Sequence, residues 1–354
     1  DCDTLSGSYT VDDSADHTPT ANPLALDIES LREQVASLRE THVFSPAAIN
    51  TATFGFSRAS YFYTGETSAS GIPAFIAGDQ VGAVVIGGSA TPNTSSSITM
   101  AGSNYGSHLF ATRNLFTYQD QIGISRGIQQ ISAGVWFQRV QSNDELALGQ
   151  YGQATFSSLQ AFLTGTVTTF TAVPSPTPLG WRLWEGAWFV QDELRLSPRF
   201  TLSLGFRDEF TNGWNEAHGR AANFVYGPDG ALKTQPRIAD SAFTINRAKF
   251  LPQPRIGLAW DVTGSGKTVI HAGFGMYNDL QDALSYRLDQ NAPFNTSITL
   301  SGEPLSNFPL VPGNIPGNYK VAPAGVQQNL YTPTVISYIF RADRELTPNT
   351  LLSV

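Results

Sequence analysis

Residues 188–210 have the sequence WFVQDELRLSPRFTLSLGFRDEF, in which apolar and polar side chains alternate around a short break. The even positions from Phe200 to Phe206 are apolar, whereas the odd positions between them hold Thr, Ser and Gly. A repeat of two residues is typical of a β-strand with two unlike faces. The break at 197–199 (SPR) predicts a tight turn, so the stretch is a hairpin of two long strands. Whether its apolar face meets a protein core or lipid decides the fold.

The composition favours an all-β chain that is poor in charge. The chain has 354 residues, of which 41% are hydrophobic and only 14% charged, whereas soluble domains have roughly a quarter charged. Many turns are expected from 32 Gly and 21 Pro. The formal net charge is −8 and no basic block is present, which argues against a nucleic-acid partner. One cysteine, Cys2, excludes an internal disulfide, and no apolar run is long enough for a membrane-spanning helix.

The hairpin pattern repeats along the chain and predicts about eleven strands. Residues 25–38 (ALDIESLREQVASL) are the weak exception, with some helical spacing, although their second half could equally begin a strand. A single strand is expected at 4–11, followed by the hairpins 32–44 with 51–63, 113–124 with 129–141, 183–196 with 200–212, 254–262 with 267–278, and 333–345 with 350–354. The long links between them are rich in Gly, Ser, Thr, Asn and Pro: 12–31, 64–112, 142–182, 213–253 and 279–332.

Short turns that alternate with long links favour a barrel in an outer membrane. Long structureless links are unusual in a compact soluble domain, whereas such barrels have short periplasmic turns and long extracellular loops. Ile256, Leu258 and Trp260 alternate with more polar residues, as strands between lipid and lumen require. An interfacial girdle is expected from aromatic residues near strand ends: Trp184, Trp188, Phe210, Trp214 and Tyr277. We therefore expect an antiparallel transmembrane β-barrel segment of about 10 or 11 meandering strands.

Three stretches resemble the barrels of TonB-dependent outer-membrane receptors. They are LRETHVFSPAAINTATFGFSR (38–58), the QDELRLSPRFTLSLGFRDE run (191–209) and PRIGLAWDVTGSGKTVIHAGFGMYND (254–279). The most similar group is that of the Oar-like receptors, which carry an N-terminal carboxypeptidase-regulatory-like domain. The resemblance covers about residues 4–354 and implies a barrel of roughly 22 strands closed by a plug, which imports bulky nutrients with energy from TonB.

Several parts of such receptors are not recognisable in this sequence. No plug, TonB-contacting box, regulatory-like domain or closing C-terminal strand is recognisable, and both ends stop within expected strands. We therefore expect residues 1–354 to be part of one barrel domain, an open half-barrel from a longer chain.

Polar residues at odd positions of the strands are the candidate contacts of the lumen. They are Gln191, Glu193, Arg195, Arg207, Glu209 and Arg255. Opposite charges on adjacent strands would neutralise each other and keep the wall rigid. Alternatively, these groups would bond a plug surface or a substrate. We expect a mixture in which the structural role is the larger.

Several other patterns suggest sites, but the sequence favours simpler interpretations. DVTGSGKTV (261–269) resembles a phosphate-binding loop, yet Asp261 stands where that loop needs Gly, and a strand follows. We interpret it as a periplasmic turn. The pair Gly273 and Gly275 lacks the third glycine of a dinucleotide fingerprint, and we expect these glycines to allow close approach of side chains or a plug.

Histidines and acidic residues give no clear metal site. The five histidines fall at no ligand spacing, and His271 is expected to bond a neighbour on the lumen side. The acidic stretch at 12–16 (DDSAD) would be an outer loop, which is expected to be solvated rather than to bind calcium. We predict no catalytic, cofactor-binding or metal-binding residues.

The predicted function is that of a non-catalytic segment of a TonB-dependent receptor in the outer membrane of a Gram-negative cell. Its partners would be membrane lipid, an unknown bulky ligand at the outer loops, and the TonB complex through a plug that this chain lacks. No nucleic acid is expected. The alternative is a secreted or surface-exposed all-β binding or adhesion protein, which should dissolve in water without detergent.

Overall fold

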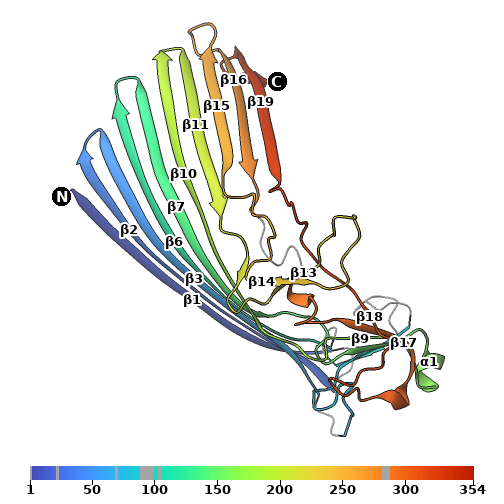
Figure 1. Cartoon of the computed structure of the whole chain (residues 1–354). Helices are drawn as coiled ribbons and strands as arrows, with labels where there is room; N and C mark the ends of the chain where they lie inside the picture. Colours follow the sequence, from blue (N-terminus) through green and yellow to red (C-terminus); the bar gives the residue numbers. More distant parts are fainter. Residues whose placement is uncertain (1, 21–23, 68–70, 88–98, 103–105, 281–287) are drawn as a thin grey trace.

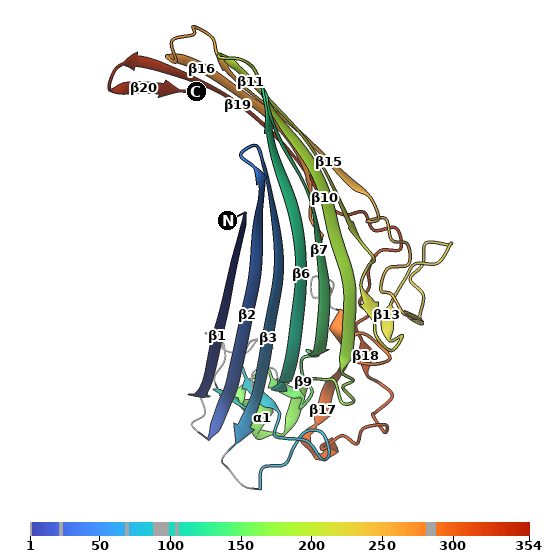
Figure 2. The same ribbon diagram turned by 90° about the vertical axis from the view of Figure 1, so that its left-hand side faces the viewer.

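The computed structural model describes residues 2–20, 24–67, 71–87, 99–102, 106–280 and 288–354. Long antiparallel strands form one curved sheet, and shorter strands gather at one end of it (Figures 1 and 2). We call the curved sheet the wall; its strand order is β1-β2-β3-β6-β7-β10-β11-β15-β16-β19-β20, with short β12 also pairing with β10. The bounds are β1 Asp3–Pro19, β2 Ala25–Ser45, β3 Ala48–Thr67, β6 His108–Arg126, β7 Gln129–Glu145, β10 Leu179–Ser197, β11 Phe200–Thr211, β12 Asn215–Glu216, β15 Leu251–Asp261, β16 Thr268–Asn278, β19 Thr334–Thr347 and β20 Thr350–Ser353.

The wall confirms the predicted meander. Each long strand pairs antiparallel with its neighbours along the chain. The tight turns lie together at one end, which we call the short-turn end, and the links cross at the other, the long-loop end (Figure 1). Strands β1 and β20 are the two edges of the described sheet, and no pairing joins them. The wall is therefore an open part of a barrel, as expected.

The predicted link at 12–31 is wrong. Strands β1 and β2 extend far into it and stay in register from Asp3 opposite His42 to Pro19 opposite Leu26. The weak helical spacing at 25–38 is wrong for the same reason, because the whole of this stretch belongs to β2. Pairing with strands on both sides satisfies its backbone groups and overrides a short local pattern.

The two faces of the wall differ as the alternation predicts. The register places Leu202 opposite Leu258 and Leu204 opposite Ile256, so these side chains share one face, which we call the outward face. Leu204 is 41% exposed and Ile256 is 47% exposed. Arg207, Glu209 and Arg255 take the alternate positions and lie on the opposite, inner face. An apolar face that stays uncovered on so many strands is suited to lipid.

The long links are not structureless, contrary to the prediction. A second sheet of six strands, the loop sheet, has the order β18-β17-β9-β8-β4-β5, with β4 and β8 parallel. Its strands come from three different links: β4 Ala83–Ile86, β5 Thr99–Ala101, β8 Gln153–Phe156, β9 Thr166–Ala172, β17 Ile298–Pro304 and β18 Lys320–Val321. The apolar core of this sheet includes Ile76, Phe156, Phe170 and Leu300, all at most 1% exposed. Local composition does not reveal such a core, because each link contributes only part of it.

The remaining elements of the links are short. They are helix α1 Leu159–Leu163, the 3₁₀ turns η3 Leu288–Gln290 and η4 Leu305–Asn307, and the hairpin of β13 Ala221–Asn223 with β14 Arg237–Ala239. Within the described residues, no helix has the length and apolar character needed to cross a membrane.

Candidate ligand site at the long-loop end

Two long links are fixed to the inner face of the wall by an apolar cluster. Val140, Trp181 and Leu183 point to the inner face and are buried beneath loop residues that include Trp214 and Leu288. The indole rings of Trp181 and Trp214 meet edge to face. The parts of these two links around Trp214 and Leu288 therefore lie over the inner face near the long-loop end.

Three buried asparagines join loop segments that are far apart in sequence. The amide of Asn223 donates to the carbonyls of Ala242 at 2.9 Å and Val326 at 3.1 Å, and its oxygen accepts from the Val326 amide at 2.7 Å. Asn291 donates to the carbonyls of Ala222 and Ala324 in the same way. Asn295 bonds both backbone groups of Thr177. Because a buried amide satisfies several backbone groups at once, these residues set the mutual position of the loops.

Glu216 in β12 anchors a loop to the start of β10. Its carboxylate accepts hydrogen bonds from the backbone amides of Gly180 at 2.8 Å, His218 at 2.7 Å and Arg220 at 2.9 Å. The guanidinium of Arg220 lies 3.3 Å from it as an ion pair. Burial acts to raise the pKa of Glu216, but the hydrogen bonds from Gly180, Arg220 and His218 outweigh it and hold the pKa below its usual value. The carboxylate is therefore kept charged, and the loop stays closed over the wall.

A pocket lies between these anchored loops. It has a volume of about 500 Å³ and is lined by Phe224, Leu232, Lys233, Ile238, Tyr319 and Val321, together with several prolines. A second hollow of about 320 Å³ shares Pro293, Thr296 and Tyr319 with it, so Tyr319 stands between two adjoining cavities. Lys233 is the one charged side chain among the described residues that line either cavity. The size and the mostly apolar lining fit a small-molecule site, which the low-complexity sequence of the loops did not suggest.

The six predicted lumen residues lie on the inner face, but they are not one cluster. Gln191 and Arg255 border a hollow of about 280 Å³ whose floor includes Gly205, Gly257 and Gly273. Arg255 donates to Gln253 at 3.2 Å, and its guanidinium lies 4.8 Å from the ring centre of Tyr277. The other four residues lie on β10 and β11, outside this hollow.

The charge pairs among them run along strands, not across them. Arg207 and Glu209 on β11 form an ion pair of 2.7 Å, and Glu193 and Arg195 on β10 are 3.7 Å apart. The prediction that these charges pair between adjacent strands is therefore wrong, because each ion pair joins two residues of the same strand. Residues two apart on a strand share a face, so long side chains can reach each other without a cross-strand partner.

Two of the five predicted girdle residues have other roles. Trp184 and Trp188 are exposed on the outward face as expected, and Phe210 packs near Phe137. Trp214, however, is buried in the loop cluster, and Tyr277 lies on the inner face under Arg255. Aromatic content near a strand end does not show which way the side chain points.

The glycine-rich stretch at 261–269 is the predicted tight turn between β15 and β16. The Asp261 carboxylate accepts hydrogen bonds from the amides of Gly264 at 2.9 Å and Gly266 at 2.8 Å. Both glycines have φ near +70° (73° and 71°), where other residues are strained. Asp261, the residue that breaks the nucleotide motif, is therefore the residue that caps the turn. On the inner face of β16, His271 lies 3.8 Å from the Asp343 carboxylate, the neighbour contact predicted for it.

The acidic stretch at 12–16 is not an outer loop, because it lies within β1. Asp13 points to the outward face, where it lies 3.5 Å from Arg32, whereas Asp12 and Asp16 alternate to the inner face. These carboxylates cannot bind one calcium ion together.

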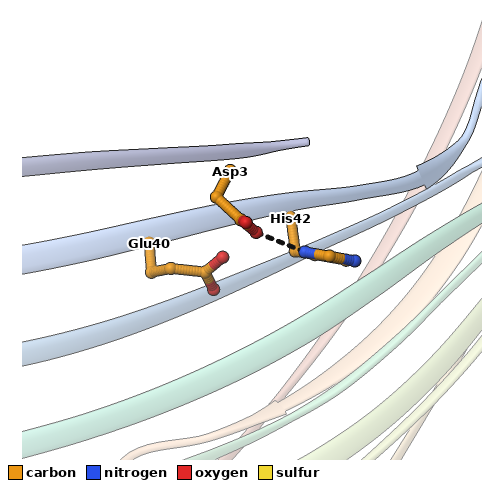
Figure 3. Close-up of side chains that lie close together, drawn as sticks. All are labelled: Asp3, Glu40 and His42. Carbon is orange, nitrogen blue, oxygen red and sulfur yellow. Dashed lines mark hydrogen bonds and ion pairs between the residues drawn. The ribbon is translucent and has the colours of Figure 1, made fainter. Parts of the chain in front are cut away.

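A different group of possible metal ligands forms near the short-turn end. Asp3 of β1 lies opposite His42 of β2 and is hydrogen-bonded to its Nδ1, and Glu40 lies beside them (Figure 3). One ligand atom from each residue falls within 4.8 Å of the others. Sequence spacing missed the group because its members come from two strands. The three side chains lie on the outward face, at the edge of the wall formed by β1. Within the described structure, no other group of three or more His, Cys, Asp and Glu side chains lies close enough together to suggest a metal site.

The fold and these faces agree with a comparison to known families. The family model for the outer membrane beta barrel domain matches residues 1–354. The chain belongs to this family. Its place is the outer membrane.

One solved transporter shows a similar fold to this outer membrane β-barrel domain, and two receptors are among the other matches. The outer membrane transporter YddB from Escherichia coli has a TM-score of 0.55 at 13% identity, covering 100% of this chain and 37% of YddB. The ferric-catecholate import receptor Fiu from E. coli K12 gives a TM-score of 0.44 at 13% identity, covering 91% and 46%. BauA, the ferric preacinetobactin receptor of Acinetobacter baumannii, gives 0.41 at 13% identity, covering 93% and 38%. No curated protein sequence matches the chain significantly.

These results confirm the family, the fold and the cellular location that the sequence predicted. The outer membrane β-barrel domain spans 37% of the length of YddB, and membership of the Oar-like group stays a prediction. A secreted β-sandwich does not fit, because the long strands form one open meander with a bare apolar face.

Proposed function

We propose that this domain is part of a TonB-dependent receptor that takes up a bulky nutrient and captures it with its long loops. The observation that carries the proposal is the pocket of about 500 Å³ between loops that are anchored to the inner face. A ligand bound there is held at the long-loop end of the wall. It would then pass along the inner face toward the periplasm.

In this proposal the inner face makes the contacts of transport, and the domain performs no chemistry. Gln191, Arg207, Glu209 and Arg255 offer hydrogen-bond donors and acceptors to a plug domain or to the passing ligand. The ion pair of Arg207 with Glu209 leaves further guanidinium and carboxylate atoms that can bond a partner. TonB would act through the plug and not through the wall. Ligand identity would be set by the lining of the pocket, in which Lys233 favours a ligand that carries an anionic group.

A growth assay tests this function. Cells that lack the gene are supplied with ferric siderophores, oligosaccharides or peptides as the only source of iron or carbon. We expect growth on at least one of these nutrients to require both the gene and TonB. A Tyr319→Arg variant should fail to restore that growth, because it replaces the aromatic ring that lines both cavities with a charged, flexible side chain. Tyr331→Arg is the matched control, since Tyr331 is 68% exposed on a loop and lines neither cavity.

Growth on every nutrient without the gene, or without TonB, would contradict the proposal. Equal growth with the Tyr319 and Tyr331 variants would still agree with a receptor, but it would show that uptake does not need this pocket.

A further inference from the structure

A row of polar residues crosses five strands on the outward face of the wall. Strand register places its members directly opposite one another from β2 to β10: Gln34, Arg58, Asn114, Gln141 and Arg182. Arg32 and Arg139 share the same face two residues away, on β2 and β7. We call Arg32, Arg58, Arg139 and Arg182 the arginine row.

The arginine row marks the edge of the apolar band. The neighbouring row of paired residues on this face lies one step closer to the short-turn end. Across the strands it holds, in order, Tyr9, Ala36, Phe56, Phe116, Arg139 and Trp184. Further outward-facing residues in that direction include Phe54, Tyr118, Val135 and Phe137, all exposed. Because short turns of such barrels face the periplasm, the row lies at the outer boundary of the hydrocarbon layer.

The arginines of this row are short of acidic partners. Within the described residues, Arg58 and Arg139 have no carboxylate at ion-pair distance, and Arg139 lies over the Trp184 ring at 5.4 Å. Arg182 donates to two backbone carbonyls and to the amide oxygen of Asn143 at 2.8 Å. Arg32 alone is paired, with Asp13.

Two acidic residues on the same face have donors of their own. Asp120 accepts from Asn50 at 2.7 Å, and Asp192 accepts from Gln129 at 2.8 Å. Both lie nearer the short-turn end than the arginine row does. Of the five arginines on the outward face of β2 to β10, four belong to the arginine row and Arg126 lies at the short-turn end, although the whole chain is acidic at −8.

We propose that the arginine row binds the phosphate groups of lipid headgroups in the outer leaflet. Guanidinium groups match phosphate oxygens in pairs of parallel hydrogen bonds. Neighbouring strands lie about 4.8 Å apart, so arginines spread over β2, β3, β7 and β10 can hold several phosphates side by side. Lipid is favoured over free phosphate as the source because the bilayer fixes headgroups at the level of this row. The inference rests on the placement of the domain in the outer membrane and not on its transport function.

Lipid retention by the purified protein tests this proposal. The full-length protein is placed in nanodiscs of zwitterionic lipid that contain a small fraction of lipid A, which bears two phosphates. We expect Arg58→Gln with Arg139→Gln to weaken lipid A binding roughly tenfold. Arg126→Gln is the matched control, because Arg126 faces outward on β6 at the short-turn end, and its binding should not change.

A conservative variant and two changes of conditions complete this test. Arg58→Lys with Arg139→Lys should retain much of the binding and shows that the positions tolerate substitution. Raising salt should strip lipid A from the unaltered protein, since exposed charge pairs are screened. Unchanged binding by the double Gln variant, or equal loss in Arg126→Gln, would overturn the proposal. Inorganic phosphate that binds the row as tightly in nanodiscs without lipid A would also overturn it, because lipid would then not be the source.

Discussion

The indole of Trp181 on the wall meets the indole of Trp214 from a long loop edge to face, with ring centres 6.5 Å apart. Trp181 is 2% exposed and Trp214 is 5% exposed, so each ring covers the other from solvent. This contact joins the two parts of the domain, since Trp181 belongs to a long strand and Trp214 to a link between strands. The loop around Trp214 is therefore held in place by apolar side chains of the inner face.

Removing the Trp214 ring should release the loops while the wall stays intact. Deleting a buried Trp side chain typically costs about 3–5 kcal/mol. We expect Trp214→Ala to expose the link at 213–253 to protease in folded protein. Trp188→Ala removes an indole of the same size from the exposed outward face and should leave the loops protected. Identical protease patterns for the two variants would show that the cluster does not hold the loops.

Asn223 should be more important than any exposed asparagine of the loops. It is 0% exposed and makes three hydrogen bonds to segments that are distant in sequence. Asn223→Ala leaves buried backbone groups without partners, each at a cost of about 1–3 kcal/mol. Hydrogen exchange of the amide of Val326 should accelerate strongly. Asn329→Ala, at an exposed loop position, should leave that exchange rate unchanged; acceleration in both variants would refute a specific role for Asn223.

Acid should open the loop that Glu216 holds. The pKa of this carboxyl is lower in the folded protein than in the unfolded chain, because hydrogen bonds outweigh burial. Its contribution to stability is therefore fully present above the unfolded pKa and is lost as the pH falls through the lowered folded pKa. Protease nicking near 213–220 should rise over that acidic range.

The Glu216→Gln variant is the control for this pH dependence. It keeps an oxygen acceptor but has no charge to titrate, so its nicking should be higher at neutral pH and should change less as the pH falls. A Glu216→Gln variant that still shows the full acid response would assign the titration to another group.

The sequence predicted the wall well and the loops poorly, for one physical reason. A strand such as Phe200–Thr211 displays its two faces in its own alternation, and its partner follows after a turn of a few residues. The pocket is different, because Phe224, Pro293 and Tyr319 come from separate stretches of two links. Glu216 and Asn223 likewise take their roles from backbone groups that only the folded chain brings near. Charge pairing along β11 was missed because the rule for adjacent strands was applied where residues two apart also share a face.

Neighbouring positions on β11 should differ sharply in their tolerance of charge. Leu204 lies opposite Ile256 on the outward face, whereas Ser203 lies opposite Gly257 on the inner face. Arg at a lipid-facing position near the middle of the membrane costs roughly 2–4 kcal/mol. Leu204→Arg should therefore lower the free energy of unfolding by about that amount in a lipid-vesicle folding assay, and Ser203→Arg should lower it much less. Equal losses would contradict the assignment of faces.

Quenching of a fluorophore by lipid tests the central claim, that β11 is part of a membrane wall, most directly. Cys2 is the one cysteine of the chain, so a Cys2→Ser background allows single cysteines to be placed at each position from 202 to 207. Each is labelled with a small fluorophore in protein reconstituted with brominated lipid. The account predicts strong quenching at positions 202, 204 and 206 and weak quenching at 203, 205 and 207. Uniform quenching, or none at the even positions, would show that the apolar face of this strand does not meet lipid.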